Sequence, residues 1–428
     1  MNRFQLALSA AVLPLLATPA VAKPADNAEG AMRALYASRP FDVARKALAA
    51  DYDRIVSEIV TLTEIPAPPF KEAKRAAAYM EMLRAAGLQD VEMDEEGNVM
   101  GLRKGTGGGP LLVVAAHLDT VFPEGLSTKV RREGDYLYAP GVGDDTCSLP
   151  VLLAFIRALD KAGIRTRSDI LFMGDVGEEG PGDLRGMRHL FNKGKYKGRI
   201  AQFISVEPGR DRVTNGGVGS KRYRVAFKGP GGHSYGAFGL VNPAYAMGDA
   251  IVEFGKMKVP ETPRTTYNGG VVEGGPSVNS IPFETAMTVD MRSVDKDELA
   301  KADAYLHSIL PGAVDRENAA RSTARGKISY EAKPIGDRPV GHTADDNPLV
   351  RTAYAAIAAG GGKPELESSS TDANLPMSLG IPAITIGSGF ATERAHSPDE
   401  RLKLDREDTV RYMTMSLATV IGAAGLAK

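Results

Sequence analysis

The sequence is poor in the residues that build many small metal and disulfide sites: it has one cysteine, no tryptophan and six histidines in 428 residues. A single cysteine excludes an intramolecular disulfide framework, a cysteine-rich zinc module and an iron–sulfur centre. Any bound metal must therefore be held by histidines and carboxylates. Excess charge is also absent, because 52 Lys and Arg offset 53 Asp and Glu to a net charge of -1. This balance gives no reason to expect nucleic acid or an anionic membrane as a partner.

Long apolar stretches are scarce, and the one run near the start of the chain is short. It covers residues 6–16, follows Arg3 and precedes Ala20-Val21-Ala22, the small-x-small pattern that signal peptidase recognises. The run is too short to cross about 30 Å of hydrocarbon, which takes roughly 20 residues, although an N-terminal membrane anchor is the alternative. We expect residues 1–22 to be a cleaved signal peptide. The mature chain would then be periplasmic or secreted, without membrane contact.

The rest of the sequence alternates between two hydrophobic periodicities. Helical spacing occurs at 41–64 and 71–86, and residues 91–102 are typical of a hairpin. Continuous apolar runs occur at 111–116, 170–173, 200–206 and 383–386, with helical patterns among them at 148–162, 187–193 and 347–359. Such runs are typical of strands buried on both faces. The alternation predicts an α/β domain with a mostly parallel sheet flanked by helices.

Residues 217–333 have a different pattern. The predicted order is strand (222–227), helix (242–257), strand (265–272), strand (283–291), helix (297–310) and strand (327–332). This split βαβ order indicates a small two-layer α+β domain. We therefore expect an inserted domain at 217–333, with 23–216 and 334–428 forming the larger α/β domain around it.

Residues with catalytic or metal-binding chemistry lie at the ends of the predicted buried strands. They are His117 and Asp119 after 111–116, Asp144 and Asp145 before the 148–162 helix, Glu178 and Glu179 after 170–173, Glu207 after 200–206, and His396 after the glycine-rich loop at 387–389. Open α/β sheets place their ligand sites at these carboxyl ends. Each motif by itself also has an ordinary explanation, such as a hydrogen-bonded loop, a helix N-cap or a solvated acidic turn.

The ordinary explanations do not account for a metal-competent group at the end of every buried strand, so we expect a metal centre. Two histidines with several carboxylates suit Zn(II), with Co(II) or Mn(II) as alternatives. These residues offer more ligands than one tetrahedral ion needs, so we expect two ions that share a bridging aspartate. In the Glu178-Glu179 pair, one carboxylate would bind metal and the other would act as general base.

The ordered motifs resemble those of the M20 metallopeptidases, the peptidase T-like and glutamate carboxypeptidase-like di-zinc hydrolases. The resemblance is carried by His117-x-Asp119, Gly143-Asp144-Asp145, Gly177-Glu178-Glu179, Glu207-Pro208-Gly209, Gly229-Pro230-Gly231-Gly232-His233-Ser234 and His396-Ser397-Pro398-Asp399-Glu400. It covers nearly the whole chain from Glu64 onward. It implies a zinc-exopeptidase-like catalytic domain and an inserted lid and dimerisation domain.

The resemblance also implies a role for each motif. One zinc would be bound by His117, Asp144 and Glu207, and the other by Asp144, Glu179 and His396, with Asp144 bridging. Asp119 would orient His117, Glu178 would be the general base, and the Asp144–Asp145 peptide bond would be cis.

Three residues of the inserted domain complete the implied site. His233 would reach into the active site of the partner subunit in a homodimer and stabilise the oxyanion. Asn279 and Arg292 would hold the carboxylate or backbone of the substrate, since arginine suits a bidentate grip. By itself, the glycine-rich segment at His233 is more typical of a surface turn, and the alternative for Arg292 is a solvated charge at a strand end.

The sequence therefore predicts a zinc-dependent exopeptidase that hydrolyses amide bonds of short peptides with metal-activated water. The enzymatic alternative is an N-acyl-amino-acid deacylase or another amidohydrolase, with an N-acyl amino acid as substrate. A third alternative is a non-catalytic peptide-binding protein, which would have lost a ligand or the base. All of these residues are present.

Overall fold

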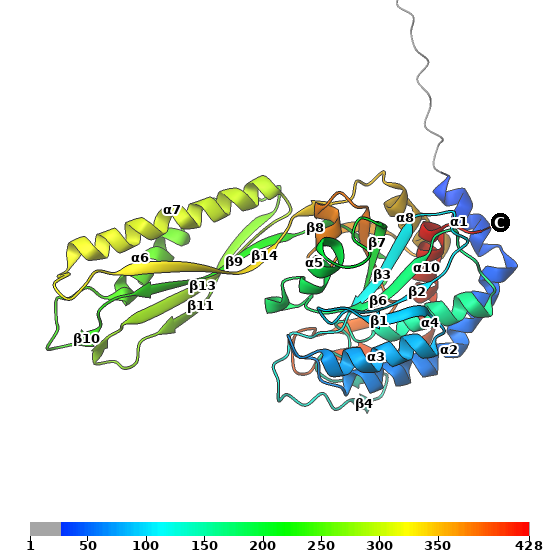
Figure 1. Ribbon diagram of the computed structural model, residues 1–428, viewed down its shortest axis with the longest axis horizontal. Helices are drawn as coiled ribbons and strands as arrows, with labels where there is room; N and C mark the ends of the chain where they lie inside the picture. The colour runs from blue at the N-terminus through cyan, green and yellow to red at the C-terminus, as the bar shows by residue number, and fades with distance from the viewer. Residues whose placement is uncertain (1–26, 428) are drawn as a thin grey trace, which may run out of the picture.

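The computed structural model describes residues 27–427, and a nine-stranded sheet forms the centre of its larger lobe (Figure 1). The strands of this sheet are, in spatial order, β1 (Gln89–Met93), β2 (Val99–Arg103), β6 (Ile170–Asp175), β3 (Leu111–His117), β7 (Ile200–Glu207), β17 (Ala383–Gly387), β8 (Arg212–Gly217) and β15 (Gly341–His342), with β16 (Glu365–Ser369) beside β8. The central run β6-β3-β7-β17 is parallel. The predicted mostly parallel α/β sheet is therefore confirmed, and the predicted signal peptide lies outside the described residues.

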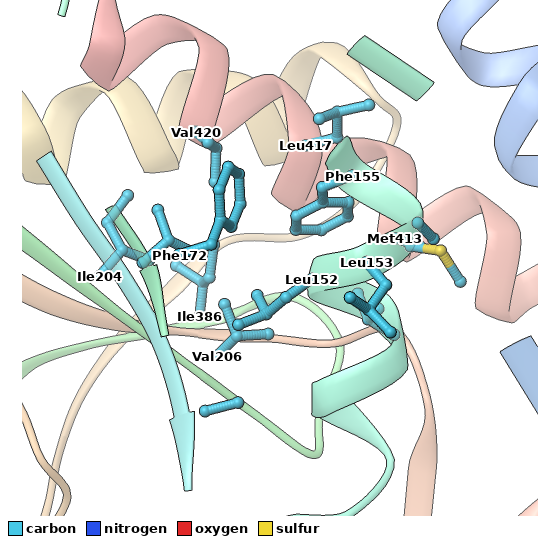
Figure 2. Packing of buried hydrophobic residues seen from close by; sticks show 14 of the residues in the cluster. Leu152, Leu153, Phe155, Phe172, Ile204, Val206, Ile386, Met413, Leu417 and Val420 are labelled. Atoms are coloured by element: carbon cyan, nitrogen blue, oxygen red, sulfur yellow. The ribbon is translucent and has the colours of Figure 1, made fainter. Parts of the chain in front are cut away.

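Helices cover both faces of this sheet because successive side chains of its buried strands point to opposite sides. In β3, Leu112 and Val114 pack into one core and Val113 into the other. The first core contains α1 (Ala28–Tyr36), α2 (Arg39–Thr63), α3 (Ala73–Ala85), α4 (Ser148–Lys161), α8 (Pro348–Ala359) and α10 (Arg406–Ala424), and the second contains α5 (Arg185–Asn192) and α9 (Asn374–Ser378). Figure 2 shows Phe155 of α4 and Leu417 of α10 in the first core. None of the described helices is long and apolar enough to cross a membrane.

The second lobe is a four-stranded antiparallel sheet covered by two helices. Its strands are, in spatial order, β11 (Thr265–Gly274), β13 (Glu284–Ser293), β9 (Gly219–Lys228) and β14 (Ser329–Arg338). Its helices are α6 (Pro243–Phe254) and α7 (Lys296–Ala320). Two short strands of two residues each, β10 (Gly232–His233) and β12 (Ser280–Ile281), pair with each other beside this sheet. The six main elements follow the predicted order. Strand β14 continues past the predicted boundary at 333 because it pairs with β9 as far as Ser220. The division of the chain into domains stays a prediction.

A small sheet joins two segments that are distant in the sequence. It contains β18 (Ala391–Glu393), β19 (Arg401–Lys403), β5 (Tyr136–Tyr138) and β4 (Arg131–Glu133). Leu402 of β19 lies opposite Leu137 of β5, and both are buried. The pairing brings the loop between β18 and β19, which carries His396, beside the segment that leads to Asp144.

Candidate metal centre

The predicted strand-end residues meet at one edge of the central sheet. His117 is the last residue of β3, and Glu207 is the last residue of β7, its parallel neighbour. Glu178 and Glu179 follow β6, the parallel neighbour on the other side. Because parallel strands end at the same edge, the topology alone places these four side chains together. Asp144 reaches them from the loop that precedes α4.

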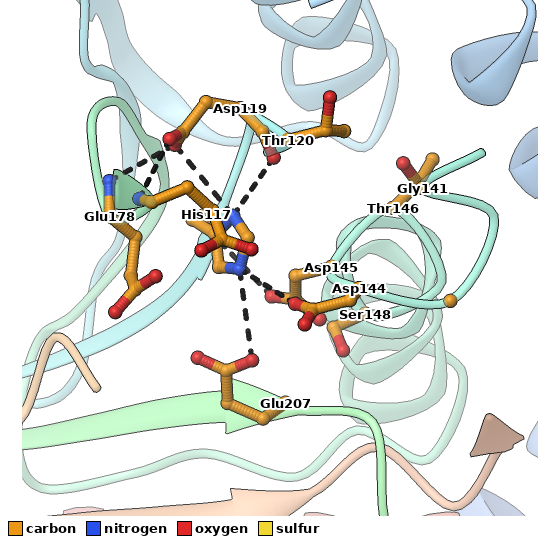
Figure 3. Close-up of polar contacts among 12 residues, drawn as sticks. His117, Asp119, Thr120, Gly141, Asp144, Asp145, Thr146, Ser148, Glu178 and Glu207 are labelled. Atoms are coloured by element: carbon orange, nitrogen blue, oxygen red, sulfur yellow. Dashed lines mark hydrogen bonds and ion pairs between the residues drawn. The ribbon is translucent and has the colours of Figure 1, made fainter. Parts of the chain in front are cut away.

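His117 directs one ring nitrogen at two carboxylates. Its Nδ1 lies 3.0 Å from the main-chain oxygen of Asp119, a carbonyl that can only accept, so Nδ1–H donates. In the neutral ring this leaves a lone pair on Nε2, which lies 3.1 Å from Asp144 Oδ1 and 3.8 Å from Glu207 Oε2 (Figure 3). A lone pair that faces two carboxylate oxygens is repulsive unless a cation lies among them. The arrangement is that of a metal ligand whose tautomer is fixed by its second nitrogen.

His396 faces the other oxygen of the same aspartate. Its Nε2 lies 3.1 Å from Asp144 Oδ2 and 3.0 Å from Glu179 Oε1. The two oxygens of Asp144 are thus directed to different imidazoles. Burial opposes ionisation of Asp144, but the adjacent imidazoles of His117 and His396 hold the pKa of this carboxyl below its usual range. Asp144 therefore stays anionic between two nitrogen donors.

Asp145 is buried next to these groups. The Asp144–Asp145 peptide bond is cis, as the family resemblance implies. Asp145 Oδ2 accepts a hydrogen bond from the main-chain N–H of His117 at 3.1 Å, which ties the loop to the end of β3. Two sets of ligand atoms lie close enough to hold an ion, His117 with Asp144 and Glu179, and His117 with Asp145 and Glu207.

Asp119 holds the loop that carries both glutamates. Its carboxylate accepts hydrogen bonds from the main-chain N–H groups of Gly177, Glu178 and Glu179 at 2.9, 3.1 and 2.9 Å. The nearest carboxylate oxygen is 3.7 Å from His117 Nδ1. Asp119 thus contacts His117 at hydrogen-bond distance through its main chain, while its side chain fixes the Glu178-Glu179 turn.

The donor set fits divalent cations. Burial raises the pKa values of Asp145, Glu207 and Glu178, because these carboxyl groups lie away from water and near one another. Cations among them would offset that cost. Imidazole nitrogens and carboxylate oxygens, without thiolates, are a suitable set for zinc.

Two residues without an assigned role in the sequence support the loops that carry the candidate metal ligands. Glu400 is fully buried, and its carboxylate accepts hydrogen bonds from the main-chain N–H groups of Gly141, Gly143 and Asp144. Arg75 of α3 is also fully buried and donates to the main-chain oxygens of Ile65 and Leu118 and to Thr146 Oγ1. Glu400 lies in the His396 motif and could have been suspected from it. An arginine within a helix gives no such signal.

A third residue that the sequence did not single out contacts the predicted base. Arg338 Nη1 lies 2.8 Å from Glu178 Oε1 and 3.0 Å from Ser370 Oγ, and Nη2 donates to the main-chain oxygen of Glu178. Only 4% of Arg338 is exposed.

A cavity of about 880 Å³ opens in front of the candidate metal-binding residues. Arg292, which the sequence predicts as a substrate ligand, lines it together with Arg222 and Arg338. Arg222 and Arg292 both bind Asp290 through Nε, at 2.8 and 2.7 Å. No acceptor for their Nη groups occurs among residues 27–427. Two guanidinium groups thus share one carboxylate and keep their outer donors for another acceptor.

The structure does not bring His233 and Asn279 to this cavity within the described chain. The main-chain N–H of Ser234, next to His233, donates to the main-chain oxygen of Asn279, and His233 lies opposite Ser280 in the β10–β12 pair. His233 is exposed and accepts hydrogen bonds through Nδ1 from the N–H groups of Tyr235 and Gly236. The two predicted residues are therefore neighbours in the second lobe.

The two-lobed α/β fold and its cluster of imidazoles and carboxylates are those expected of a metal-dependent hydrolase. The model of Peptidase family M20/M25/M40 matches residues 113–421, and the chain belongs to this family. It is accordingly a hydrolase of peptide or amide bonds that depends on metal. The predicted family, fold class and class of reaction are confirmed.

Curated relatives and solved structures agree with this assignment. The chain is 25% identical to carboxypeptidase G2 of Pseudomonas sp. (strain RS-16), over 71% of this chain and 72% of that protein. It is 25% identical to a putative succinyl-diaminopimelate desuccinylase of Mycobacterium tuberculosis, over 80% and 91%. Its fold is similar to that of aminopeptidase PepT from Bacillus cereus, with a TM-score of 0.69, 20% identity and coverage of 87% and 99%. Human carnosine dipeptidase 1 has the same TM-score at 12% identity, with coverage of 90% and 99%.

Proposed function

We propose that the protein is a di-zinc exopeptidase that hydrolyses amide bonds at the ends of short peptides. The observation that carries this proposal is the Asp144 carboxylate, whose two oxygens each lie 3.1 Å from a different imidazole Nε2, one of His117 and one of His396. A carboxylate in this position suits the ligand that two adjacent ions share. The predicted base, Glu178, lines the same cavity.

The proposed ligands of one zinc are His117, Asp144 and Glu207, and those of the other are Asp144, Glu179 and His396. The distances from His117 to Glu207 and from His396 to Glu179 support this grouping. Co(II) and Mn(II) bind similar donors and are the alternatives. When bound, such ions polarise a carbonyl group and lower the pKa of water.

The residues of the chain supply proton transfer. Water adds its oxygen to the carbonyl carbon of the substrate, and Glu178 accepts the proton that the water loses. The bond from that carbon to nitrogen then breaks, and Glu178 returns the proton to the leaving nitrogen. Asp119 supports this transfer because its carboxylate holds the main chain on which Glu178 lies.

The substrate in this proposal carries a free carboxylate. Arg292 and Arg222 would bind it, because both line the cavity and their Nη groups are not occupied by Asp290. Charge-assisted hydrogen bonds from two planar guanidinium groups suit a carboxylate. Asn279 would assist from the partner subunit together with His233.

A homodimer would complete the site. His233 is exposed in the second lobe and would stabilise the oxyanion of the partner subunit. Exposed apolar side chains on this lobe support association: Val271 and Val272 on the edge strand β11 are 50% and 59% exposed, and Val252 on α6 is 58% exposed. Sedimentation that shows a fully active monomer would remove this role of His233.

We place the mature enzyme in the periplasm or outside the cell, because residues 1–22 have the pattern of a signal peptide. N-terminal sequencing of the protein from cell fractions tests this. A mature N-terminus near residue 23 in the periplasmic or secreted fraction supports it, and an intact N-terminus on a membrane pellet contradicts it.

The activity is tested with a mixed panel of dipeptides, tripeptides and acyl-peptides, incubated with the zinc-loaded protein and profiled by mass spectrometry. Loss of single residues from one end supports the exopeptidase. Release of acyl groups alone would favour the N-acyl-amino-acid deacylase, the reaction class that the name of the desuccinylase relative indicates. If Glu178→Ala and the wild type process the panel equally, the catalytic proposal is wrong and a peptide-binding protein becomes the better account.

A further inference from the structure

Arg338 is the last residue of β14, the strand that leads from the second lobe back to the larger one. The strand register sets the position of Arg338 in the sheet. Arg338 lies opposite Ser220 of β9, which lies opposite Arg292 of β13. The three residues form one row across the sheet, at the end nearest the metal centre. Arg338 and Arg292 both line the cavity from this row.

The guanidinium of Arg338 contacts Glu178 at two points. Nη1 donates to the carboxylate oxygen Oε1 at 2.8 Å, and Nη2 donates to the main-chain oxygen of the same residue. Nη1 also lies 3.0 Å from the hydroxyl of Ser370. Both side chains of the ion pair are buried: the exposed fraction of the side chain alone is 5% for Arg338 and 7% for Glu178. A buried pair with this many contacts has little freedom to rotate.

The second oxygen of Glu178 is left for chemistry. Within the described chain, Oε2 has no hydrogen-bond partner, and Glu178 lines the cavity. A general base needs one oxygen with an accessible lone pair, and its efficiency depends on where that oxygen is held. The contact at Oε1 and the contact at the main chain together determine the direction in which Oε2 points.

We infer that Arg338 is the positioning residue of the base: it binds Oε1 of Glu178 so that Oε2 faces the cavity and exchanges the proton with water and the leaving nitrogen. This inference rests on the proposed function, in which Glu178 is the general base. The proton binds only Oε2, and the contact between Oε1 and Arg338 persists through both transfers. The role needs arginine, because the two terminal nitrogens of one planar group bind the carboxylate and the carbonyl together, and the single ammonium of lysine does not reproduce this fork.

The test is a double-mutant cycle in the zinc-loaded full-length protein, with Arg338→Ala, Glu178→Gln and the double variant. A positioned base contributes at least about 10²-fold to the rate, so we expect Arg338→Ala to lower kcat about 100-fold and to change KM less than about threefold. In the Glu178→Gln background, the same substitution should have almost no further effect on kcat. Arg338→Lys should recover only part of the loss, and added guanidinium ion should raise the kcat of Arg338→Ala.

Lys221→Gln is the matched control. Lys221 forms an ion pair with Asp337, the neighbour of Arg338 on β14, at 2.9 Å, and it does not line the cavity. The Lys221→Gln substitution removes a positive charge next to Arg338 without changing a contact of Glu178. We expect kcat of this variant to be within about twofold of the wild type. Zinc content and a crystal structure of Arg338→Ala show whether the metal is retained while the Glu178 carboxylate has moved.

Each outcome decides the question. A kcat of Arg338→Ala near the wild-type value, a loss confined to KM, a loss of zinc, or an equal loss in the Glu178→Gln background would each overturn the positioning role. An active wild type, an inactive Glu178→Gln and a normal Arg338→Ala would refute this inference alone. A zinc-loaded wild type that hydrolyses nothing in the panel would refute the proposed function and the inference with it.

Discussion

Replacing Glu400 with glutamine perturbs Asp144, the proposed bridging ligand, without changing any proposed metal ligand. The carboxylate of Glu400 accepts two hydrogen bonds at Oε1, from the N–H groups of Gly143 and Asp144 at 2.8 Å, and one at Oε2, from Gly141 at 3.1 Å. In Glu400→Gln, the amide nitrogen replaces Oε2 and faces the Gly141 N–H. One buried donor loses its acceptor, at a cost of about 1–3 kcal/mol.

The change reaches Asp144 through the loop: the Gly141 N–H loses its acceptor at Oε2, and the same side chain holds the main-chain N–H of Asp144 at Oε1. A free energy of about 1.4 kcal/mol corresponds to a factor of ten, so we expect zinc affinity to fall roughly 10- to 100-fold, as for other residues that orient metal ligands. Competition with a chromogenic chelator measures this affinity. Glu393→Gln, on the surface of the same small sheet, is the control. Zinc affinity of Glu400→Gln within about threefold of the wild type would refute the reasoning.

Three further predictions use other parts of the site. In zinc-free protein, burial raises the pKa values of Asp175 and Glu400 to about 7. Both groups bind protons more tightly in the folded state, so their contribution to the free energy of unfolding is fully present below about pH 4 and is lost as the pH rises through 7. The slope is at most about 2.7 kcal/mol per pH unit. Urea unfolding in chelator at pH 5.5 and 7.5 checks the sign, and stability that rises with pH would contradict it. Arg222→Gln should raise KM about tenfold or more for peptides with a free C-terminal carboxylate but not for their amides, since a hydrogen bond to a charged group contributes about 1.5–3 kcal/mol. Arg224→Gln, on the same strand but outside the cavity, is the control. An equal rise in KM for the acids and the amides would argue against binding of the substrate carboxylate by Arg222. Arg75→Met should lower the free energy of unfolding by about 3–5 kcal/mol, because two buried acceptors and one partly buried acceptor lose their donor. Exposed Arg84→Met on the same helix should change it by less than about 0.5 kcal/mol, and equal effects in thermal unfolding would contradict this account.

The part of the site at the strand ends could be predicted from the sequence for a physical reason. Continuous apolar runs mark strands that are buried on both faces, and parallel strands of one sheet end at the same edge. His117, Glu178 and Glu207 follow directly from that rule. His396 does not, because it is brought to the site by three-residue strands, which are too short to show a periodicity. Its motif, and not its predicted structure, indicated its role.

The supporting residues were harder to predict for a different reason. Arg75 lies in a helix and Arg338 at the end of a strand, and arginines at such positions are usually solvated. Their role depends on burial and on contacts with loops that are distant in the sequence, such as the 2.8 Å contact from Arg75 to the main-chain oxygen of Leu118. Helical and strand periodicities carry no information about such contacts. The domain division and the approach of His233 to a partner site depend equally on long-range arrangement, and they stay predictions.

The two lobes supply different parts of the proposed reaction. The larger lobe contributes every proposed metal ligand and Glu178, whereas Arg222 and Arg292 come from strands of the second lobe. Arg338 connects the two, because it ends β14 and binds Glu178. The placement of the proposed base and the grip on the substrate carboxylate therefore depend on the same strands, β9, β13 and β14, whose residues face the cavity in adjacent rows. A change in the angle between the lobes would move Arg222 and Arg292 together with Arg338, the residue that binds Glu178. The angle between the lobes therefore affects both substrate binding and proton transfer.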